Sequence, residues 1–338
     1  MRGVYFNGTG AEFRDDLQKP VPSATESLIR ILYAGVCNTD REVLKGYRPS
    51  FRGVMGHEFV GVVEESSDLS WVGKTVVGEL NAGCGHCIYC RTGREKHCLT
   101  RRVIGMEKKD GCFAEYMTLE THLLHEVPST LAPETALLTE PLAAALQVTK
   151  QVHIQPDLPI AVIGDGRLAY QVASVLRLTG ANLTVIGKHP EKLAQFESFG
   201  RTMTIEQAEN LANQALESGE GSYEIVVEAC GAPSGLELAA KIVRKQGTIV
   251  LKSTYAGKTN VDMSFYAVNE ITIKGSRCGP FDPALRLLEQ GLVKLPPVEF
   301  YELEDYEKAF GSRAFKAGFR IGKYINLNKG KTGAPFAK

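Results

Sequence analysis

Short apolar segments alternate with helix-like segments over the second half of the chain. The apolar segments have the length and flanking turns of strands, and they are Pro159–Ile163, Leu183–Ile186, Ile225–Glu228 and Thr248–Leu251. The segments with helical spacing of apolar residues are Arg167–Leu178, Glu191–Phe199, Ile205–Ser218 and Gly235–Val243. Because a helix between two strands returns the chain across a sheet, this alternation predicts βαβ units and a doubly wound parallel sheet, an α/β fold.

A glycine-rich turn follows the first of these strands. Its residues are Gly164-Asp165-Gly166-Arg167-Leu168-Ala169, with the spacing G-x-G-x-x-A. Gly164 permits the tight turn, Gly166 lets a pyrophosphate approach the backbone, and Ala169 allows close packing of helix on strand. The free N–H groups at the helix N-terminus also favour a phosphate. We expect a dinucleotide to be bound by Gly164, Gly166, Arg167, Leu168 and Ala169.

The end of the second strand bears on which dinucleotide is bound. NAD-binding sheets carry an acid there, about 20 residues after the turn, which accepts a hydrogen bond from the ribose 2′-OH. Here the strand is followed by Gly187, Lys188 and His189. Gly187 leaves room, and Lys188 and His189 could contact a 2′-phosphate, so the sequence favours NADP over NAD. Two alternatives stay open: a solvated turn whose Lys188 contacts nothing, and a contact from Glu191 to the ribose.

The first half has a different texture, with short β-branched runs separated by Gly and Pro. Ser27–Tyr33, Phe59–Glu64 and Thr75–Gly78 predict a β-rich module. The change from this β-rich pattern to the alternating pattern falls at Gln151–Pro159, where Gln155-Pro156-Asp157 indicates a turn. Beyond about Arg277 the pattern is mixed, with an expected helix and an expected strand at Pro283–Gln290 and Arg320–Leu327.

Four of the eight cysteines stand in one short stretch. Cys84, Cys87, Cys90 and Cys98 form the pattern C-x2-C-x2-C-x7-C. Four thiolates can surround one Zn²⁺ as a tetrahedron and fill its coordination shell, so we expect a structural rather than a catalytic site. An iron–sulfur cluster is the weaker alternative, because ferredoxin cysteines are spaced differently. His86 and His97 are interpreted as exposed loop residues.

Composition argues against two kinds of partner. The chain has 39 Lys and Arg against 39 Asp and Glu, and a zero net charge disfavours nucleic-acid binding by phosphate neutralisation. No stretch approaches the roughly 20 apolar residues that cross a membrane, and no signal-peptide core follows Met1. We expect about two domains in the cytoplasm, where clustered cysteines indicate metal binding or catalysis.

A second set of metal-ligating residue types lies in three separate segments. They are Gly35-Val36-Cys37-Asn38-Thr39-Asp40, Gly56-His57-Glu58-Phe59-Val60-Gly61 and Glu140-Pro141-Leu142-Ala143. Cys37, His57 and a carboxylate supply three ligands and leave a fourth position open, which is the pattern of a catalytic zinc site. Each segment alone is weak, since a lone cysteine is commonly a small buried residue.

Together these segments resemble the zinc-dependent medium-chain dehydrogenase/reductase family, from Met1 to about Leu327. Asp110–Tyr116 and Val226–Gly231 are also similar to the family's pattern. The resemblance implies a GroES-like β-rich catalytic domain, residues 1–150 and 278–338, split in sequence around a Rossmann domain, residues 151–277. The active site is then expected in the cleft between the two domains.

The resemblance also implies roles for single residues. Cys37 and His57 match catalytic zinc ligands, and Glu58 matches the carboxylate beside that histidine. Glu140 stands where the alcohol dehydrogenases proper carry a cysteine ligand, and Glu140-Pro141 is more similar to the polyol, threonine and glucose dehydrogenases. In that branch the glutamate binds zinc directly or through water, so Glu58 and Glu140 can exchange during turnover.

Two neighbours of Cys37 have implied roles in proton transfer and orientation. Thr39 matches the hydroxyl that takes the substrate proton, and Asp40 matches the acid that orients the zinc-binding histidine and raises its basicity. Glu42 stands where many relatives have the outer histidine of a proton relay. It either passes protons to solvent or is a plain exposed residue, and the relay can also run through the cofactor ribose.

The resemblance thus implies an oxidoreductase with one catalytic and one structural zinc. It transfers a hydride between a secondary alcohol, polyol or sugar and NADP, or alternatively NAD, and it forms a homodimer or homotetramer. Two other functions stay open: a zinc-ribbon binding module, and a member that has lost catalysis and acts as a redox sensor. A zinc-free enoyl or quinone reductase is disfavoured, because those relatives lack both cysteine sets.

Overall fold

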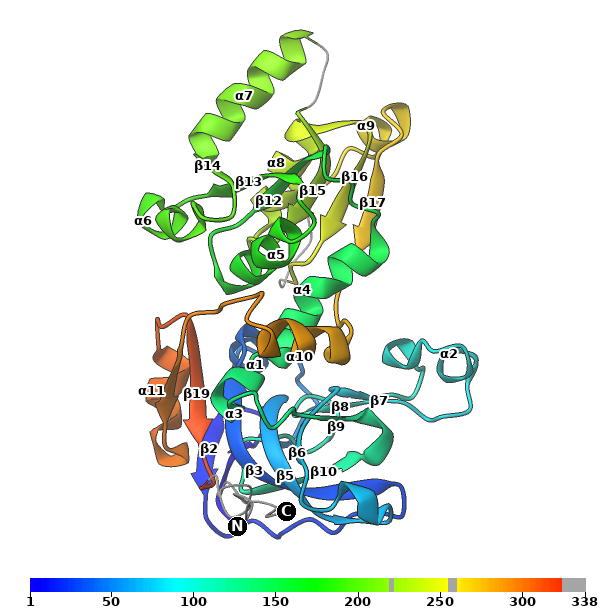
Figure 1. Cartoon of the computed structure of the whole chain (residues 1–338), viewed down its shortest axis with the longest axis vertical. Helices are drawn as coiled ribbons and strands as arrows, with labels where there is room; N and C mark the ends of the chain where they lie inside the picture. The colour runs from blue at the N-terminus through cyan, green and yellow to red at the C-terminus, as the bar shows by residue number, and fades with distance from the viewer. Residues whose placement is uncertain (219–221, 255–259, 324–338) are drawn as a thin grey trace, which may run out of the picture.

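A computed structural model describes residues 1–218, 222–254 and 260–323 of the chain. Figure 1 shows a β-rich half and, stacked on it along the long axis, a half built on a parallel sheet. Helix α4 (Thr139–Gln151) leads from the first half toward the second. This architecture confirms the predicted fold class, while the boundaries at residues 150 and 278 stay predictions. Residues 324–338 of the predicted catalytic domain lie outside the described ranges.

The parallel sheet has six strands, and its order is that of a doubly wound fold. Across the sheet the strands run in the order β14 (Arg201–Thr204), β13 (Asn182–Gly187), β12 (Pro159–Ile163), β15 (Tyr223–Glu228), β16 (Val243–Leu251) and β17 (Thr272–Gly275). All neighbouring pairs are parallel. The helices that connect these strands are α5 (Arg167–Arg177), α6 (Pro190–Leu193), α7 (Ile205–Ser218), α8 (Pro233–Ile242) and α9 (Met263–Val268).

The central strand and the helix after it show why this half folds as it does. In β12 the residues from Ile160 to Ile163 are all buried, as expected for a strand covered on both faces. Helix α5 turns its small and branched residues inward at helical spacing, namely Ala169, Val172, Ala173 and Leu176. Burial of the larger side chains, Val172 and Leu176, contributes about 1.5–3 kcal/mol each.

The β-rich half is organised around a seven-stranded sheet. Its strands run in the order β11 (Leu124–Glu126), β6 (Thr75–Gly78), β5 (Glu58–Ser66), β3 (Glu26–Val36), β19 (Lys316–Arg320) and β18 (Val298–Tyr301), and β10 (Tyr116–Glu120) also pairs with β3. Strand β3 is buried on both faces, because Ile31 packs into one core and Leu32 into the other. The chain therefore returns from its far end to complete a sheet begun near its start.

Smaller elements surround this sheet. One antiparallel sheet joins β2 (Ala11–Arg14), β1 (Gly3–Phe6) and β4 (Gly53–Val54), and another sheet joins β7 (Asn81–Ala82), β8 (Arg102–Ile104) and β9 (Lys108–Lys109). The helices of this half are α1 (Asn38–Leu44), α2 (Ile88–Arg91), α3 (Pro133–Ala136), α10 (Phe281–Glu289) and α11 (Tyr306–Gly311). Single 3-10 turns occur at Leu69–Trp71, Glu95–His97, Thr121–Leu123, Ala194–Phe196 and Leu303–Asp305. Among the helices described, none has the length and apolar character needed to span a bilayer.

Candidate active site

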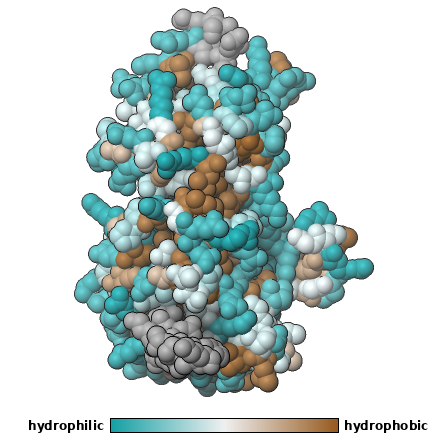
Figure 2. All heavy atoms as spheres, viewed as in Figure 1, coloured by the Kyte–Doolittle hydropathy of each residue, from teal (hydrophilic) through white to brown (hydrophobic). Residues whose placement is uncertain are grey.

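The four clustered cysteines form a lobe between β7 and β8 that stands off the side of the molecule (Figures 1 and 2). Donor atoms of Cys84, Cys87, Cys90 and Cys98 all lie within 4.8 Å of one another. The N–H groups of Cys84 and Cys87 donate to the Sγ atoms of Cys98, at 3.3 Å, and Cys84, at 3.4 Å. Burial raises the pKa of Cys98, but main-chain N–H groups outweigh it and lower that pKa to about 6. Main-chain N–H groups therefore favour the thiolate, the form that binds metal, at Cys98, whereas burial raises the pKa of Cys90 to about 12.

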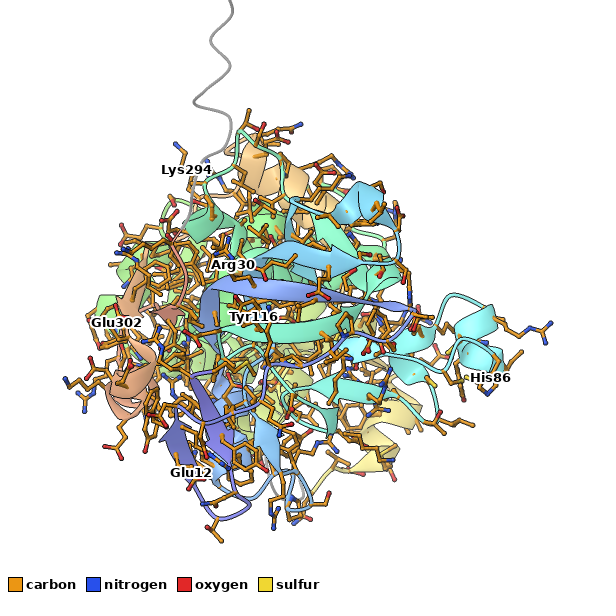
Figure 3. All side chains as sticks on the ribbon, turned by 90° about the horizontal axis from the view of Figure 1, so that it is seen from below. Glu12, Arg30, His86, Tyr116, Lys294 and Glu302 are labelled. Carbon is orange, nitrogen blue, oxygen red and sulfur yellow. The ribbon has the colours of Figure 1, made fainter. Side chains whose placement is uncertain are left out.

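The two histidines of the lobe lie apart from this group. His86 and His97 are both exposed, and neither belongs to the four-donor group. Figure 3 shows His86 at the outer end of the lobe, where its Nδ1 lies 2.8 Å from the carbonyl oxygen of Cys84. The cysteines alone supply the four ligands of a tetrahedral site.

The second metal-ligating group forms where two neighbouring strands meet. Strand β3 ends at Val36 and β5 begins at Glu58, and Gly35 pairs with Glu58 in the antiparallel register. This register places Cys37, just after β3, beside His57, just before β5. Donor atoms of Cys37, His57 and Glu58 lie within 4.8 Å of one another. The structure thus brings Cys37 beside His57 and Glu58, which are neighbours of each other but distant from Cys37 in the sequence.

Asp40 links two members of this group. It lies in the first turn of α1, and its Oδ2 accepts a hydrogen bond of 2.7 Å from the N–H of Cys37. Its Oδ1 lies 3.2 Å from His57 Nδ1, and both side chains are buried. Burial lowers the pKa of His57, but Asp40 and Cys37 outweigh it and raise that pKa well above its ordinary value. With Nδ1 facing Asp40, Nε2 is the nitrogen left for a metal.

Glu58 has a partner from the far end of the chain. The ammonium of Lys316, in β19, forms an ion pair with Glu58 Oε2, and both side chains are buried. Glu58 Oε1 has no hydrogen-bond partner among the described residues. The free oxygen, together with Cys37 and His57, gives one sulfur, one nitrogen and one oxygen donor, a set that fits a catalytic zinc ion.

The remaining residues expected at this site lie close by but are not all in the group. Glu140, in the first turn of α4, lies outside the three-residue donor group. Burial, with the charge of Glu58 as a second cause, raises the pKa of Glu140 to about 7. Thr39 Oγ1 lies 3.7 Å from Cys37 Sγ. Glu42 forms an ion pair of 2.9 Å with Lys45.

The glycine-rich turn between β12 and α5 has the geometry of a phosphate cradle. Gly164 has φ +133°, and a Cβ there would lie 2.7 Å from the carbonyl oxygen of Ala229, so both conformation and space require glycine. A Cβ on Gly166 would meet nothing within 4 Å, which leaves open space at the helix N-terminus. Arg167 Nη1 is buried there without a hydrogen-bond partner among the described residues. This cradle fits the pyrophosphate of a dinucleotide.

The end of β13 differs from the sequence-based expectation. Gly187 does leave room, but the side chain of Asp165 occupies it: a Cβ on Gly187 would lie 2.8 Å from Asp165 Cβ. The N–H groups of Lys188 and His189 both donate to Asp165 Oδ2, each at 2.8 Å. Asp165 thus engages the main-chain N–H groups of both residues and the ring of His189, 2.9 Å away, while the side chain of Lys188 is exposed.

Two parts of the chain match described protein families. Residues 23–129 match the alcohol dehydrogenase GroES-like domain, and residues 166–290 match the zinc-binding dehydrogenase domain. The chain belongs to the zinc-dependent medium-chain dehydrogenase/reductase family. It is therefore a dehydrogenase, an enzyme of the oxidoreductase class.

Individual relatives match this dehydrogenase over nearly the full length of both chains. A D-arabitol-phosphate dehydrogenase from Enterococcus avium is 29% identical over 329 residues, which cover 92% of this chain and 93% of the relative. A zinc-binding dehydrogenase from Sinorhizobium meliloti, solved with NADP, is 24% identical with a TM-score of 0.83, covering 94% and 98%. An alcohol dehydrogenase from Escherichia coli, solved with NADH, is 24% identical with a TM-score of 0.85, covering 95% and 99%. The two solved structures share the fold.

One buried lysine of the dehydrogenase, Lys252, was not predicted from the sequence. Lys252 follows β16, and its Nζ donates to the carbonyl oxygens of Ala144, at 2.6 Å, and Arg277, at 3.1 Å, and to Ser276 Oγ, at 3.3 Å. Burial lowers the pKa of Lys252 to about 8. The lysine joins α4, the parallel sheet and the segment that leads back to the β-rich half. Sequence offered no signal for it, because its partners are mostly main-chain atoms.

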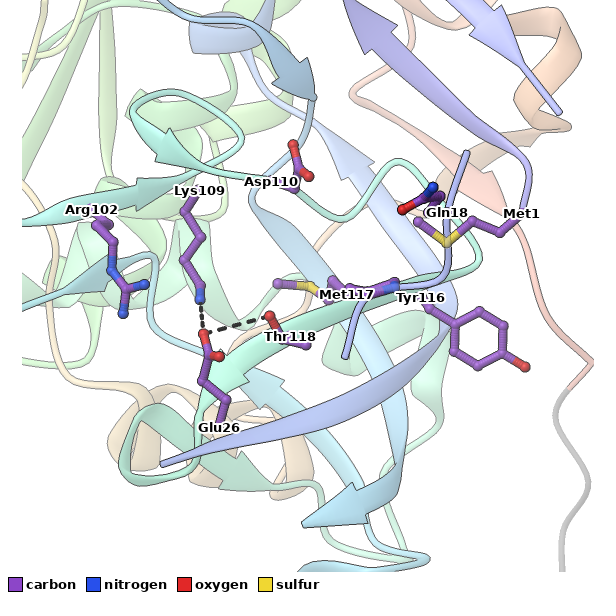
Figure 4. Close-up of a pocket in the computed structure, with 10 residues that line it drawn as sticks. Met1, Gln18, Glu26, Arg102, Lys109, Asp110, Tyr116, Met117 and Thr118 are labelled. Atoms are coloured by element: carbon purple, nitrogen blue, oxygen red, sulfur yellow. Dashed lines mark hydrogen bonds and ion pairs between the residues drawn. The ribbon is translucent and has the colours of Figure 1, made fainter. Parts of the chain in front are cut away.

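A pocket of the dehydrogenase shown in Figure 4 lies in the β-rich half, and its lining contains none of the expected site residues. Ion pairs balance three of its charged residues, Glu26, Arg102 and Lys109. Lys109 forms ion pairs with Glu26, at 2.5 Å, and Glu120, at 3.4 Å, and Arg102 also pairs with Glu120. These pairs stabilise the join of β3, β8, β9 and β10 and balance the charges of Glu26, Arg102 and Lys109.

Proposed function

We propose that the chain is a zinc-dependent dehydrogenase that transfers a hydride between a secondary alcohol, polyol or sugar and a nicotinamide dinucleotide. The observation that carries this proposal is the convergence of donor atoms of Cys37, His57 and Glu58, within 4.8 Å of one another, in a chain whose parallel sheet also carries a phosphate cradle. Burial lowers the pKa of Arg41 in α1, and the positive charge of Arg167 in α5 lowers it further. The positive charge of the cradle is therefore felt at α1, the helix that begins beside the metal-ligating group.

Cys37, His57 and Glu58 would hold the catalytic zinc in this proposal, with Glu140 as an exchange ligand. Asp40 holds the ring of His57 and the N–H of Cys37 in place. Thr39 takes the proton from the substrate hydroxyl. When bound, zinc supplies Lewis-acid polarisation of the substrate oxygen and the nicotinamide accepts the hydride.

The cofactor would lie across the carboxyl ends of the parallel strands. Gly164, Gly166, Arg167, Leu168 and Ala169 form the cradle for its pyrophosphate. The second zinc would bind Cys84, Cys87, Cys90 and Cys98 and hold the lobe together. The sequence favours NADP through Gly187, Lys188 and His189, and the contacts of Asp165 bear directly on that choice.

The substrate class follows from the Glu140-Pro141 pattern and from the polyol-phosphate relative. Both are analogies, so they indicate a class and no single compound. A homodimer or homotetramer and a cytoplasmic location stay predictions from the resemblance and the composition.

The test combines zinc content with activity. We expect two zinc ions per wild-type chain, and we expect Cys37→Ser or His57→Ala to lower kcat/KM on a polyol and sugar panel by roughly a thousandfold, the worth of several kcal/mol of Lewis-acid stabilisation. Circular dichroism should show an intact fold in both variants. Cys230→Ser is the control, since Cys230 is exposed and outside both metal groups.

The proposal would be wrong if Cys37→Ser kept wild-type kcat/KM. A single zinc per chain, released only on denaturation, with no nucleotide bound would indicate the binding-module or sensor function instead.

A further inference from the structure

Asp165 occupies an unusual place in the nucleotide cradle. It is the middle residue of the Gly164-Asp165-Gly166 turn, yet its side chain reaches across to the end of the neighbouring strand, β13. Its Oδ2 accepts hydrogen bonds from two N–H groups, of Lys188 and His189, and lies 2.9 Å from His189 Nδ1. The first strand's turn therefore supplies a carboxylate to the end of the second strand.

This carboxylate stands where another dinucleotide-binding sheet would carry its acid. In NAD-binding sheets an Asp or Glu at the end of the second strand accepts a hydrogen bond from the ribose 2′-OH. In this chain that end is Gly187, and a Cβ added to Gly187 would lie 3.1 Å from Asp165 Oδ2. Only glycine at this point admits Asp165, and Asp165 brings the missing negative charge to the same location.

The two oxygens of Asp165 have different surroundings. Oδ2 is engaged by three nitrogen atoms, whereas Oδ1 has no hydrogen-bond partner among the described residues and is not fully buried. Burial raises the pKa of Asp165, but the donors on His189 and Lys188 outweigh it and hold that pKa below its ordinary value. The group is thus an anchored carboxylate with one free acceptor, as a ribose hydroxyl requires.

A 2′-phosphate meets two obstacles here. The N–H groups at this strand end already donate to Asp165 and are not available to a phosphate, and the phosphate's negative charge would face a carboxylate in a partly desolvated site, where like charges repel strongly. Lys188, beside the end of β13, is exposed, so water screens its attraction for a phosphate, and Arg167 lies on the other side of the turn, where it belongs to the pyrophosphate cradle.

We infer that Asp165 is the residue that selects the cofactor, and that it selects NAD(H) over NADP(H). The inference rests on the proposed function, because it assumes a nicotinamide dinucleotide in the cradle. It reverses the preference that Lys188 and His189 suggest from the sequence, since both residues serve to anchor Asp165. Specificity for the cofactor then comes from a carboxylate that belongs to the turn after β12 but lies at the end of β13.

Binding of cofactor fragments tests the inference on the full-length, zinc-loaded protein without any turnover. Calorimetry compares 5′-AMP with 2′,5′-ADP, and nucleotide fluorescence compares NADH with NADPH. We expect wild type to bind NADH at least about tenfold more tightly than NADPH. Asp165→Asn, which keeps the shape and removes the charge, should shift the ratio of the two Kd values at least about tenfold toward NADPH.

Two further variants make the result specific to Asp165. Asp165→Ser gives a second charge-free side chain in case the amide disturbs the loop, and it should shift the ratio in the same direction. Glu191→Gln is the matched control, because it removes an exposed negative charge from the start of α6 and should leave the ratio unchanged.

The measured Kd ratios distinguish failure of the inference about Asp165 from failure of the proposed function. Tighter NADPH binding by wild type, an unchanged ratio in both Asp165 variants, or a shift in Glu191→Gln alone would overturn the inference while leaving the proposed function standing. If wild type bound neither NADH nor NADPH, the proposed function itself would fail. A shift confined to the Asp165 variants would establish Asp165 as the selecting residue.

Discussion

Glu58 and Lys316 form a buried ion pair at the centre of the metal-ligating group. Water cannot screen or solvate either charge, so each depends on the other for its stability in the metal-free protein. Removing one member of such a pair leaves an uncompensated buried charge, whereas removing both is often close to neutral.

Replacing Lys316 alone should therefore destabilise the metal-free protein. We expect Lys316→Met to cost about 3–5 kcal/mol, seen as a lower melting temperature in the presence of a chelator. The double variant Glu58→Gln with Lys316→Met should recover most of the loss. Lys294→Met is the control, since Lys294 is exposed. A double variant no more stable than Lys316→Met would contradict the explanation.

At the scale of single residues, motifs predicted the ligand candidates but not their partners. The spacing of Cys84, Cys87, Cys90 and Cys98 was sufficient to predict that they cluster, because short loops bring them together. Lys316 was missed, since a lone lysine in a strand is usually exposed and its partner lies far away in the sequence. Asp165 was counted as a variable position of the glycine motif, and only the fold shows its reach to β13.

At the scale of elements, the four-cysteine lobe is tied to the chain's return from the parallel sheet. Lys96 in the lobe donates to the carbonyl oxygen of Cys278, at 2.8 Å. Asn81, at the base of the lobe, donates to Cys278 Sγ, at 3.3 Å. The lobe has little apolar core of its own, because Cys98 is its one fully buried cysteine, so a metal must hold its shape.

Loss of one lobe cysteine should consequently loosen the lobe and its contact with Cys278. We expect Cys98→Ser to reduce the zinc content by one ion per chain and to lower the melting temperature by several degrees, since a structural zinc contributes folding free energy. Metal analysis and calorimetry measure the two effects. Cys230→Ser should change neither value, and unchanged melting in Cys98→Ser would argue against a structural role.

The accuracy of the predicted elements depended on local signals. Helices α8 and α10 lie within two residues of the ranges expected for them. The expected helix Glu191–Phe199 is shorter, a single turn from Pro190 followed by a 3-10 turn. No helix was expected over α4, whose Pro141 lies in the first turn, where proline loses no hydrogen bond. In place of the expected strand Arg320–Leu327, the structure has β19, Lys316–Arg320. Residues 324–327 of the expected strand lie outside the described residues.

At the scale of the whole molecule, contacts of Lys252 and His125 stabilise the segment by which the chain returns to the β-rich half. Lys252 joins α4 to residues 276 and 277. His125 in β11 joins α10, because its Nδ1 lies 2.5 Å from Asp282 Oδ1 while its Nε2 lies 3.3 Å from Glu79 Oε1. Burial lowers the pKa of His125, but Glu79 and Asp282 outweigh it and raise that pKa above its ordinary value.

The His125 contact should make stability depend on pH. A raised folded-state pKa gives stabilisation that is fully present below the unfolded pKa, about 6.5, and is lost as pH rises through the higher folded value. We expect up to about 1 kcal/mol, because Asp282 is exposed. Melting temperatures measured from slightly acidic to alkaline pH should fall more for wild type than for His125→Gln.

The exposed His86 provides the control for this titration. His86→Gln should follow the wild-type pH profile. Identical profiles for wild type and His125→Gln would show that the contact contributes nothing that depends on protonation.

The split architecture could be predicted only through resemblance. Strand and helix patterns indicated a β-rich part followed by a parallel sheet, but no pattern along residues 298–320 shows that they join the sheet of β3. That pairing depends on contacts between distant segments, Ala317 with Val36 and Gly318 with Gly35. Physical patterning thus predicts layers, while the closing of a sheet by a far segment has no local signature.

The pairing of β19 with β3 also sets an order in time. A chain grows from its N-terminus, and domains tend to fold as they are made. Cys37, His57 and Glu58 emerge early, but the cation that balances Glu58 comes from Lys316, after the whole parallel sheet has been synthesised. Until then Glu58 can remain hydrated in an open sheet. Charge balance at the metal-ligating group is therefore among the last events of biogenesis, and a nascent chain keeps this centre unfinished while the cofactor-binding sheet is still forming.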